Sequence, residues 1–223
     1  AKPFIKWVGG KSQLIEQLDS LLPADFDNCR DVTYIEPFVG GGAMLFYMLQ
    51  RYPNIKRAVI NDINPDLICC YRTVRDFPED LIVSLQQVEK EYLRLDTEEA
   101  RKEFFMAARA RYNQKNLDSI ENTTLFFFLN RTCFNGLYRV NKSGAFNVPF
   151  GKYTNPTICD SETIRADSKL LQRVEICQGD FEHTFDYAEG NTFFYFDPPY
   201  RPLSDTSSFN DYTKESFNDT AQI

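Results

Sequence analysis

A glycine-rich turn between two short apolar segments constrains the fold of this chain more than any other feature. Residues 33–37 and 57–61 are predicted to be buried strands, and between them the three glycines at 40–42 precede an apolar helical stretch at 43–50. Strand, tight turn, helix and second strand within about 30 residues form a βαβ unit. Such a unit predicts an α/β fold with a parallel sheet, in which ligands bind at the carboxyl ends of the strands.

The pattern becomes helical from residue 65 to about 130. Pro65 and Pro78 suit first helical turns, because proline lacks the N–H that such a position leaves unpaired. Asp96 is predicted to cap a further helix, with Glu99 at its third position. Because the triplet Phe126-Phe127-Phe128 lies within a helical pattern, core packing is a better interpretation of these rings than a stacking platform for bases.

Glycines and prolines punctuate residues 134–153, as in a loop followed by a hairpin. Strand character returns at 174–177 and 193–196. We therefore expect a Rossmann-like α/β sheet interrupted by a mainly helical insertion. The predicted division is a discontinuous catalytic domain, residues 1–64 and 159–223, and an inserted domain, residues 65–158.

Only about four strands can be counted along the chain. The last stretch, from Pro202 to Ile223, is rich in Ser, Thr, Asn and Asp and contains no further strand pattern. We therefore expect the C-terminal strands of the sheet to be missing.

Composition excludes several classes of protein. The six cysteines include no C-x-x-C pair and there is a single histidine, His183, so no zinc site is predicted and the thiols are expected to be reduced. His183 is expected to be an ordinary surface or packing residue. The longest apolar run, Leu125 to Leu129, is too short to cross a bilayer, and no signal peptide pattern is visible. A soluble, cytoplasmic protein is expected.

Charge is distributed unevenly. The net charge of −7 argues against a polyanionic partner, but residues 101–153 contain nine Lys and Arg against three Asp and Glu. The remainder of the chain therefore carries about −13, and this asymmetry indicates a basic face for phosphates on an acidic body. Solvated lysines and arginines on a helical lobe would explain the charge alone equally well.

The strongest chemical signal is the segment Asp197-Pro198-Pro199-Tyr200, which follows an apolar strand. An aromatic exocyclic amine is a poor nucleophile because its lone pair is delocalised into the ring. A carboxylate from Asp197 and the carbonyl of Pro198, both accepting N–H bonds from the amine, favour a pyramidal nitrogen with a localised lone pair. The prolines hold the backbone extended, and Tyr200 offers a flat face to a base removed from the helix. A simple surface turn after a strand is the alternative.

The second signal lies at the ends of the other strands. The turn at 40–42 lets the backbone approach a ligand closely, although Leu45 breaks the G-x-G-x-x-G pattern of dinucleotide-binding proteins. Asp62 ends the next strand, where a carboxylate can hold ribose hydroxyls. Asp180 and Phe181 follow the 174–177 strand, where an acid and a ring can frame an adenine. An acidic residue at one strand end is common, whereas four in one domain are not.

Together these motifs resemble the Dam-type N6-adenine DNA methyltransferases, most closely the DpnM type, which belong to the alpha group of amino-methyltransferases. The resemblance covers nearly the whole chain and is carried by seven segments: 3–11 (PFIKWVGGK), 36–43 (EPFVGGGA), 61–64 (NDIN), 134–141 (FNGLYRVN), 146–151 (FNVPFG), 179–181 (GDF) and 197–200 (DPPY). It implies a methyltransferase sheet with an inserted DNA-recognition domain and direct methyl transfer from S-adenosylmethionine to N6 of a flipped adenine, without a metal.

The resemblance also implies the roles of single residues. It assigns ten residues to the cofactor: Trp7, Gly10, Lys11, Phe38, Gly40, Gly42, Asp62, Asp180, Phe181 and Asp197. It assigns four residues to the target adenine and catalysis: Asp197, Pro198, Pro199 and Tyr200. It assigns six residues to DNA: Lys6, Phe134, Asn135, Leu137, Arg139 and Pro149.

The residues alone support a DNA role for Arg139, because an arginine on a glycine-bounded loop can contact O6 and N7 of a guanine. A phosphate contact or a surface ion pair remains an alternative for it, and Arg131 can be structural or phosphate-binding. The resemblance implies double-stranded DNA as the substrate, GATC as the site, and a role in strand marking or in a restriction-modification pair. A cognate endonuclease would act on the same site without direct contact.

Three other functions remain open from the residues. Methylation of cytosine N4 or of a glutamine amide uses related tetrapeptides, although Asp rather than Asn at 197 disfavours the amide. A catalytically inactive module that only binds DNA or the cofactor is the second. A dehydrogenase that binds NAD at the glycine turn is the third.

Overall fold

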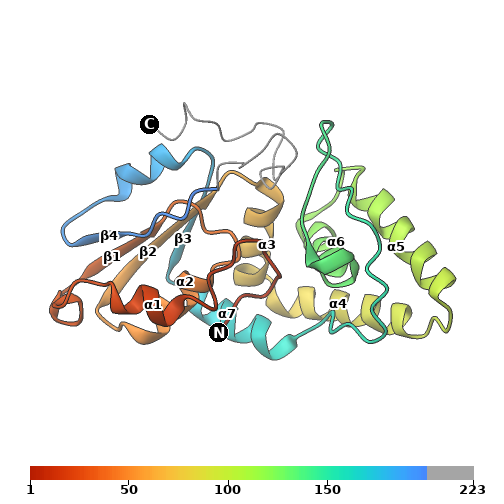
Figure 1. Ribbon diagram of the computed structural model, residues 1–223, viewed down its shortest axis with the longest axis horizontal. Coiled ribbons are helices and arrows are strands. Elements are labelled where there is room, and N and C mark those ends of the chain that lie inside the picture. Colours follow the sequence, from red (N-terminus) through yellow and green to blue (C-terminus); the bar gives the residue numbers. More distant parts are fainter. Residues whose placement is uncertain (200–223) are drawn as a thin grey trace.

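The computed structural model describes residues 1–199 and confirms the predicted α/β fold (Figure 1). Within these residues four strands form one sheet in the order β3-β2-β1-β4, and every neighbouring pair is parallel. The strands are β1 (Val32–Glu36), β2 (Ile55–Asp62), β3 (Val174–Gln178) and β4 (Thr192–Phe194). Each predicted strand is present, with bounds that differ from the prediction by one or two residues.

Helices make up most of the remaining described chain. The α-helices are α1 (Ile15–Ser20), α2 (Ala43–Arg51), α3 (Pro65–Asp76), α4 (Pro78–Leu93), α5 (Glu98–Tyr112), α6 (Ser119–Thr132) and α7 (Ser161–Leu171). Short 3₁₀ helices are η1 (Phe26–Asn28), η2 (Phe134–Gly136) and η3 (Phe181–Tyr187). No helix among residues 1–199 is both long and apolar enough to cross a membrane.

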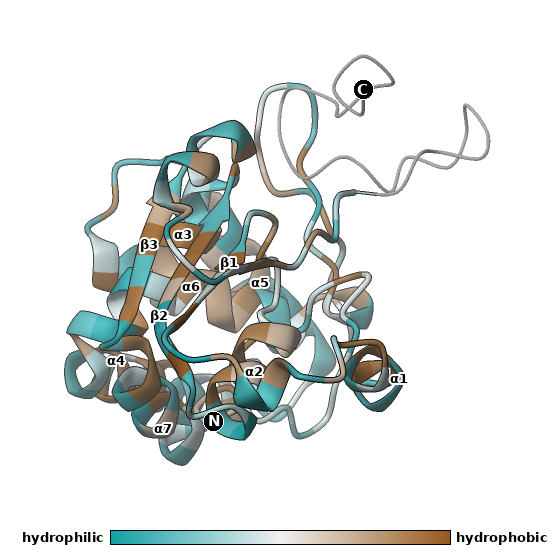
Figure 2. Cartoon of the chain, turned by 90° about the vertical axis from the view of Figure 1, so that its left-hand side faces the viewer, coloured by the Kyte–Doolittle hydropathy of each residue, from teal (hydrophilic) through white to brown (hydrophobic). Residues whose placement is uncertain are grey.

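The central strands are buried on both faces, as is usual for a parallel sheet. All five residues of β1 are buried, and Ile35 and Val59, which pair across β1 and β2, are fully inaccessible. Helix α3 contacts β2, β3 and α7, and α7 also contacts α2 and β3. Figure 2 shows the apolar colouring along these strands and the inward faces of the helices. Burial from both sides explains why apolar residues follow one another at 34–35 and 58–60 and do not alternate with polar ones.

Helices α4, α5 and α6 lie beside the sheet rather than on it (Figure 1). Helix α6 is the centre of this group, since it contacts α3, α4 and α5. Its rings Phe126, Phe127 and Phe128 are at most 2% exposed, which confirms that they pack in the core. One hydrophobic cluster runs from β1 and β2 into these helices, so the two parts of the molecule share a core.

The helix starts are mostly as predicted, with one correction. Pro65 and Pro78 are the first residues of α3 and α4. The prediction that Asp96 caps the next helix is wrong: the N-cap is Thr97, whose hydroxyl oxygen accepts the backbone N–H of Ala100 at 3.1 Å. Both residue types can cap a helix, and the extended backbone of Thr97 decides between them.

The segment after α6 is irregular and folds back on itself. Cys133 bridges Phe150, and Val140 bridges Phe146, both antiparallel. The tip is a turn in which the backbone N–H of Gly144 donates to the carbonyl oxygen of Asn141 at 2.8 Å. These contacts confirm the predicted loop and hairpin, hereafter the 133–150 hairpin. All six cysteines are free thiols, and His183 is exposed.

Candidate active site

The candidate active site is formed by loops at the carboxyl edge of the sheet. Strands β1 and β4 are parallel neighbours with Ile35 opposite Phe194, and the N–H of Tyr195 donates to the carbonyl oxygen of Ile35 at 2.9 Å. The glycine turn leaves β1 at this edge, and Asp197 leaves β4 beside it. Two motifs that are about 155 residues apart in sequence are thus adjacent because parallel strands end on the same side.

The N-terminal segment connects these two loops. The ammonium of Lys11 lies 2.9 Å from Oδ1 of Asp197 and 2.9 Å from the carbonyl oxygen of Gly9. Both charged side chains are largely shielded, with 15% of Lys11 and 26% of Asp197 exposed. The indole of Trp7 lies against the glycine turn, since a Cβ at Gly40 would be 2.9 Å from its Cδ1. Trp7 therefore contacts the glycine turn, and Lys11 contacts Asp197.

Glycine is required in the turn for two reasons. Gly40 and Gly42 have φ of +48° and +72°, in the left-handed region that L side chains rarely adopt. A Cβ at Gly42 would also lie 2.4 Å from the hydroxyl oxygen of Tyr71. That hydroxyl donates to the carbonyl oxygen of Gly40 at 2.9 Å, and this bond holds the turn in place. Helix α2 starts directly after Gly42, so the turn places a helix N-terminus at this edge.

Asp62 and Asn61, at the end of β2, hold the neighbouring loops. One carboxylate oxygen of Asp62 accepts the N–H of Gly40 at 3.1 Å, and the other accepts the N–H of Asn64 at 2.9 Å. Burial raises the pKa of Asp62 to about 6, although these N–H bonds lower it. The Asn61 amide donates to the carbonyl oxygens of Pro37 and Gly179, and so joins the loops after β1 and β3.

Glu36 is a buried acid beneath the same edge. Its carboxylate accepts the hydroxyl of Tyr34 at 2.9 Å, and only 2% of the residue is exposed. Burial, together with the negative charges of Asp197 and Asp62, raises the pKa of Glu36 to about 8, against the hydrogen bond from Tyr34. Asp197 and Asp62 are therefore close enough to this carboxyl group to affect its ionisation.

The loop after β3 contributes an aromatic ring. Phe181 lies 5.3 Å from Phe38, centroid to centroid, with the ring planes tilted by 32°. Asp180 caps η3 by accepting the N–H of Glu182 at 2.9 Å, and its side chain is exposed. Gly10, beside Trp7, is exposed in the N-terminal loop. The structure thus brings the cofactor candidates to one edge of the sheet.

The DNA candidates form a second group, on the 133–150 hairpin and the N-terminal segment. Asn130, buried in α6, joins them: its amide accepts the N–H of Lys6 and donates to the carbonyl oxygens of Lys6 and Gly136. Gly136 has φ of +63°, and a Cβ there would lie 2.4 Å from Cδ of Lys6. Lys6 therefore packs against the turn of the hairpin segment, and its ammonium lies 5.1 Å from the ring centroid of Tyr153.

Four of the hairpin candidates are exposed. Phe134 is 51% exposed, and Asn135 beside it has φ of +54°. The carbonyl oxygen of Pro149 accepts the N–H of Phe134 at 2.8 Å, so these two lie together. The guanidinium of Arg139 donates from Nε to the side-chain oxygen of Asn147 at 2.8 Å. Leu137 differs, because it is half-buried against the core.

Two further polar residues and one ring of the site were not singled out from the sequence. Asn130 joins Lys6 to Gly136, and Asp66 accepts hydrogen bonds from Tyr112 and Tyr138. Asn130 had one visible signal, since an amide among the apolar residues of α6 must find partners when it is buried. Asp66 and Tyr138 had none, because their contact joins residues far apart in the sequence.

The second half of the catalytic motif is only partly described. Pro198 is exposed and Pro199 half-buried after β4, whereas Tyr200 lies outside the described residues, as does the polar stretch from Pro202 to Ile223. Among residues 1–199 no group of three or more His, Cys, Asp and Glu side chains is arranged to hold a metal ion.

Comparison with known proteins identifies the family of the chain. Residues 7–223 match the family described as D12 class N6 adenine-specific DNA methyltransferase. The chain belongs to this family. It is 50% identical along its whole length to Type II methyltransferase M.MjaIII of Methanocaldococcus jannaschii, of which it covers 77%. It is 40% identical to Type II methyltransferase M1.LlaDCHI of Lactococcus lactis subsp. cremoris. The matched region includes all of this chain and 74% of the relative.

More distant relatives agree with this assignment. A DNA adenine methylase of Vibrio cholerae is 34% identical over 97% of this chain and 71% of its own length. The predicted resemblance to adenine-specific DNA methyltransferases is therefore confirmed, together with the Rossmann-like fold class. Membership of the family implies S-adenosylmethionine as the methyl donor.

The residues at the edge have the chemistry that this donor requires. An ammonium from Lys11 suits a carboxylate, and the carboxylate of Asp62 suits the hydroxyls of a ribose. The rings of Phe38 and Phe181 suit a purine. The backbone N–H groups of Gly40, Ile63 and Asn64 occupy three of the four acceptor positions of the Asp62 carboxylate, so one remains for a ligand. The donor set is consistent with an amino acid, a sugar and a base bound along one edge.

Proposed function

We propose that this methyltransferase transfers a methyl group from S-adenosylmethionine to N6 of an adenine that has been flipped out of duplex DNA, within the site GATC. The observation that carries the proposal is the placement of Asp197 beside the glycine turn, where the N-terminal segment contacts the turn through Trp7 and Asp197 through Lys11. A base held at Asp197 would therefore lie next to a ligand held by the turn.

Three groups of residues are proposed to hold the cofactor. Trp7, Gly10, Lys11, Phe38, Gly40 and Gly42 would surround its methionine end, Asp62 would bind the ribose hydroxyls, and Asp180 and Phe181 would contact the adenine ring. When bound, S-adenosylmethionine supplies an electrophilic methyl group on a positively charged sulfur. The protein then needs no metal and no covalent intermediate, and its contribution is positioning and hydrogen-bond polarisation.

Asp197 is proposed as the catalytic residue that activates the amine. Its carboxylate and the carbonyl oxygen of Pro198 would accept the two N6 hydrogens, which localises the nitrogen lone pair toward the cofactor. Pro199 keeps this backbone extended, and Tyr200 would stack on the base. The ion pair with Lys11 orients the carboxylate, because one of its oxygens is already fixed at 2.9 Å from the ammonium.

Residues 65–158 are proposed as the inserted DNA-recognition domain, between the two parts of the catalytic domain. Phe134 and Asn135 would fill the space left by the flipped base, which fits their exposure at the start of the hairpin. Leu137 and Arg139 would contact base edges, Lys6 would read a second guanine, and Pro149 would touch a thymine methyl group.

A methylation assay tests the proposal directly. Duplexes that differ only in one GATC site are incubated with labelled S-adenosylmethionine, and the label is located by digestion to nucleosides and mass spectrometry. The expected result is N6-methyladenine only in duplexes that contain the site. Methylation confined to cytosine would support the N4 alternative, whereas binding of both ligands without turnover would support an inactive module.

The names of the relatives support two possible cellular roles, a restriction-modification pair and strand marking. Two of them are named type II methyltransferases, which supports a pair with a restriction endonuclease that cleaves the same unmethylated site. Relatives named DNA adenine methylase support strand marking instead. In either role the enzyme would act in the cytoplasm, where its DNA substrate lies.

A further inference from the structure

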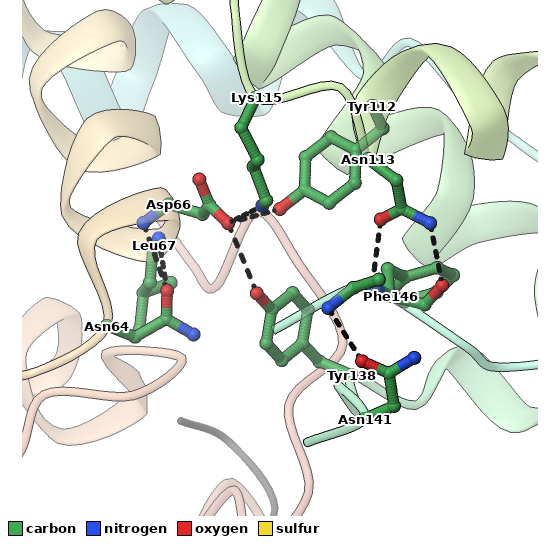
Figure 3. Close-up of polar contacts among 10 residues, drawn as sticks. Asn64, Asp66, Leu67, Tyr112, Asn113, Lys115, Tyr138, Asn141 and Phe146 are labelled. Carbon is green, nitrogen blue, oxygen red and sulfur yellow. Dashed lines mark hydrogen bonds and ion pairs between the residues drawn. The ribbon is translucent and has the colours of Figure 1, made fainter. Parts of the chain in front are cut away.

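A cluster of polar and aromatic side chains connects the candidate active site to the 133–150 hairpin. Asp66, the second residue of α3, lies four residues after Asp62 at the end of β2. Oδ2 of Asp66 accepts the hydroxyl of Tyr112 at 2.7 Å and that of Tyr138 at 3.3 Å, and pairs with the ammonium of Lys115 at 2.5 Å (Figure 3). A single carboxylate thus joins the start of α3, the end of α5 and the hairpin.

Tyr138 occupies the central position in this cluster. It is 8% exposed and lies between Leu137 and Arg139, the two side chains proposed to contact base edges. Its ring stacks on Trp7 at 5.5 Å and 24°, and on Phe126 of α6 at 5.2 Å and 24°.

Trp7 also contacts the glycine turn at 40–42, which is proposed to hold the cofactor. A Cβ at Gly40 or Gly41 would lie within 3.0 Å of Trp7, so the indole and the glycine turn are in direct contact. A continuous series of contacts therefore runs from the glycine turn through Trp7 and Tyr138 into the hairpin, and a second runs from Asp62 through α3 and Asp66 to the same tyrosine.

We propose that Tyr138 and Asp66 are positioning residues that couple the cofactor site to the DNA-reading hairpin. Neither residue touches either ligand in this proposal, which rests on the proposed function. A ligand that presses on the glycine turn acts on Trp7, and any shift of Trp7 acts on the backbone that carries Leu137 and Arg139. Packed rings transmit such a shift because they have no free volume in which to absorb it. Binding of cofactor therefore favours the hairpin conformation that binds DNA, and the reverse must hold to the same extent.

The coupling is measurable as a ratio of affinities. S-adenosylhomocysteine is titrated into the protein alone and with saturating duplex of the sequence methylated in the assay above, and the duplex is titrated with and without S-adenosylhomocysteine. Trp7 is the single tryptophan of the chain, so its fluorescence reports the first titration. We expect each ligand to increase the affinity of the protein for the other by roughly 5-fold or more, within the usual range for coupled sites.

Two substitutions at Tyr138 separate the ring from the hydroxyl. Tyr138→Leu removes the stack on Trp7 and is expected to bring the coupling ratio close to one. Tyr138→Phe retains the stack and loses the hydrogen bonds of the hydroxyl with Asp66, Tyr112 and Asn64, so it is expected to keep part of the coupling. Asp66→Asn, which is nearly isosteric, tests the second series of contacts and is expected to lower the ratio.

Tyr92→Leu is the matched control. Tyr92 is a buried tyrosine in α4 whose ring packs against Phe104 and Phe128, and its hydroxyl has no hydrogen-bond partner among the described residues. This variant loses a core ring of the same size, and it is expected to melt at a lower temperature while keeping the wild-type coupling ratio.

The outcomes distinguish this inference from the proposed function. A wild-type protein that binds both ligands and methylates adenine with a coupling ratio of one would overturn the coupling alone, as would a wild-type ratio in Tyr138→Leu. Absence of methylation by the wild type would overturn the proposed function itself.

Discussion

The carboxyl edge of the sheet and the 133–150 hairpin are built in opposite ways. At the edge, polar groups are buried and bonded to the backbone: Glu36 is 2% exposed, and both oxygens of Asp62 accept loop N–H groups. On the hairpin, Phe134 is 51% exposed and Arg139 lies at the surface. The edge is therefore organised before a small ligand arrives, whereas the hairpin presents side chains that can adapt to a large partner.

The basic residues of the insertion also fall into two groups, those that bond to other parts of the protein and those at the surface. The excess of positive charge between residues 101 and 153 suggested a face for phosphates, but much of it is used internally. Arg101 and Arg109 donate to carbonyl oxygens of the segment 148–154, Arg111 pairs with Glu121, and Lys152 pairs with Glu98. Arg131 donates to the carbonyl oxygen of Phe4, which gives it a structural role. Lys142 and Arg139 are exposed and remain the better candidates for contact with DNA.

The largest effect is expected at the edge, from Asp197→Ala. Loss of the carboxylate removes the acceptor that localises the amine lone pair, so kcat for methyl transfer should fall by about 10²–10³-fold or more, as when a preorganised polar group is removed from other active sites. The affinity for S-adenosylhomocysteine, measured by Trp7 fluorescence, should change much less. Asp186→Ala is the matched control, because Asp186 is an exposed aspartate of η3, and it should stay fully active. An active Asp197→Ala enzyme would contradict the proposed mechanism.

The next effect tests how rigidly the edge is built. Gly42→Ala places a Cβ at a φ of +72° and within 2.4 Å of the Tyr71 hydroxyl, so we expect a loss of about 2–4 kcal/mol in the free energy of unfolding. Gly190→Ala is the control, since its φ is +58° but a Cβ would meet nothing within 4 Å. Its cost should be limited to about 1–2 kcal/mol of backbone strain. The free energy of unfolding is measured by urea denaturation. Equal losses in the two variants would mean that the turn can shift to accommodate the added methyl group.

The hairpin should respond in specificity rather than in stability. Arg139→Ala is expected to cost about 1–3 kcal/mol in discrimination at one guanine, measured as the ratio of kcat/KM for the cognate duplex and a duplex changed at that position. Lys142→Ala, at the hairpin tip, should weaken binding to all duplexes alike and leave the ratio unchanged. If Arg139→Ala behaves like Lys142→Ala, its guanidinium contacts only phosphates.

The sequence predicted the sheet well because local patterns determine its strands. Short segments of strand character identified all four described strands, and the glycines at 40–42 identified the turn between β1 and α2. The motifs at the strand ends were readable for the same reason, since a parallel sheet collects its carboxyl ends at one edge. The strand bounds differ because hydrogen bonding, and not apolarity, decides where a strand ends.

The sequence could not reveal contacts that join distant segments. The capping prediction at Asp96 was wrong because Thr97 is an equally good cap, and only the helix geometry decides. Asp66, Asn130 and Tyr138 were missed because their contacts reach distant segments: Asp66 bonds Tyr112 and Tyr138, 46 and 72 positions away, and Asn130 bonds Lys6, 124 positions away. The internal use of Arg101 and Arg109 was hidden likewise, because charge counts do not identify partners.

The smallest effect concerns the buried acid under the edge. The pKa of Glu36 is raised to about 8 by burial, so the folded protein keeps this group protonated where the unfolded chain has ionised it. The free energy of unfolding must therefore decrease as the pH rises from about 4.5 to 8, because the folded state binds the extra proton. Glu36→Gln removes this dependence and keeps an acceptor for Tyr34. The melting temperature of Glu36→Gln should therefore exceed that of the wild type by more at pH 9 than at pH 5.

A matched substitution isolates the effect of burial at Glu36. Glu103 is an exposed glutamate of α5, and Glu103→Gln should shift the melting temperature by the same small amount at both pH values. A parallel pH dependence for Glu36→Gln and the wild type would mean that Glu36 ionises in the folded protein near its ordinary pKa. The carboxyl edge would then be open to water in the way that the hairpin is, and the contrast between the two regions would lie in their side chains rather than in their burial.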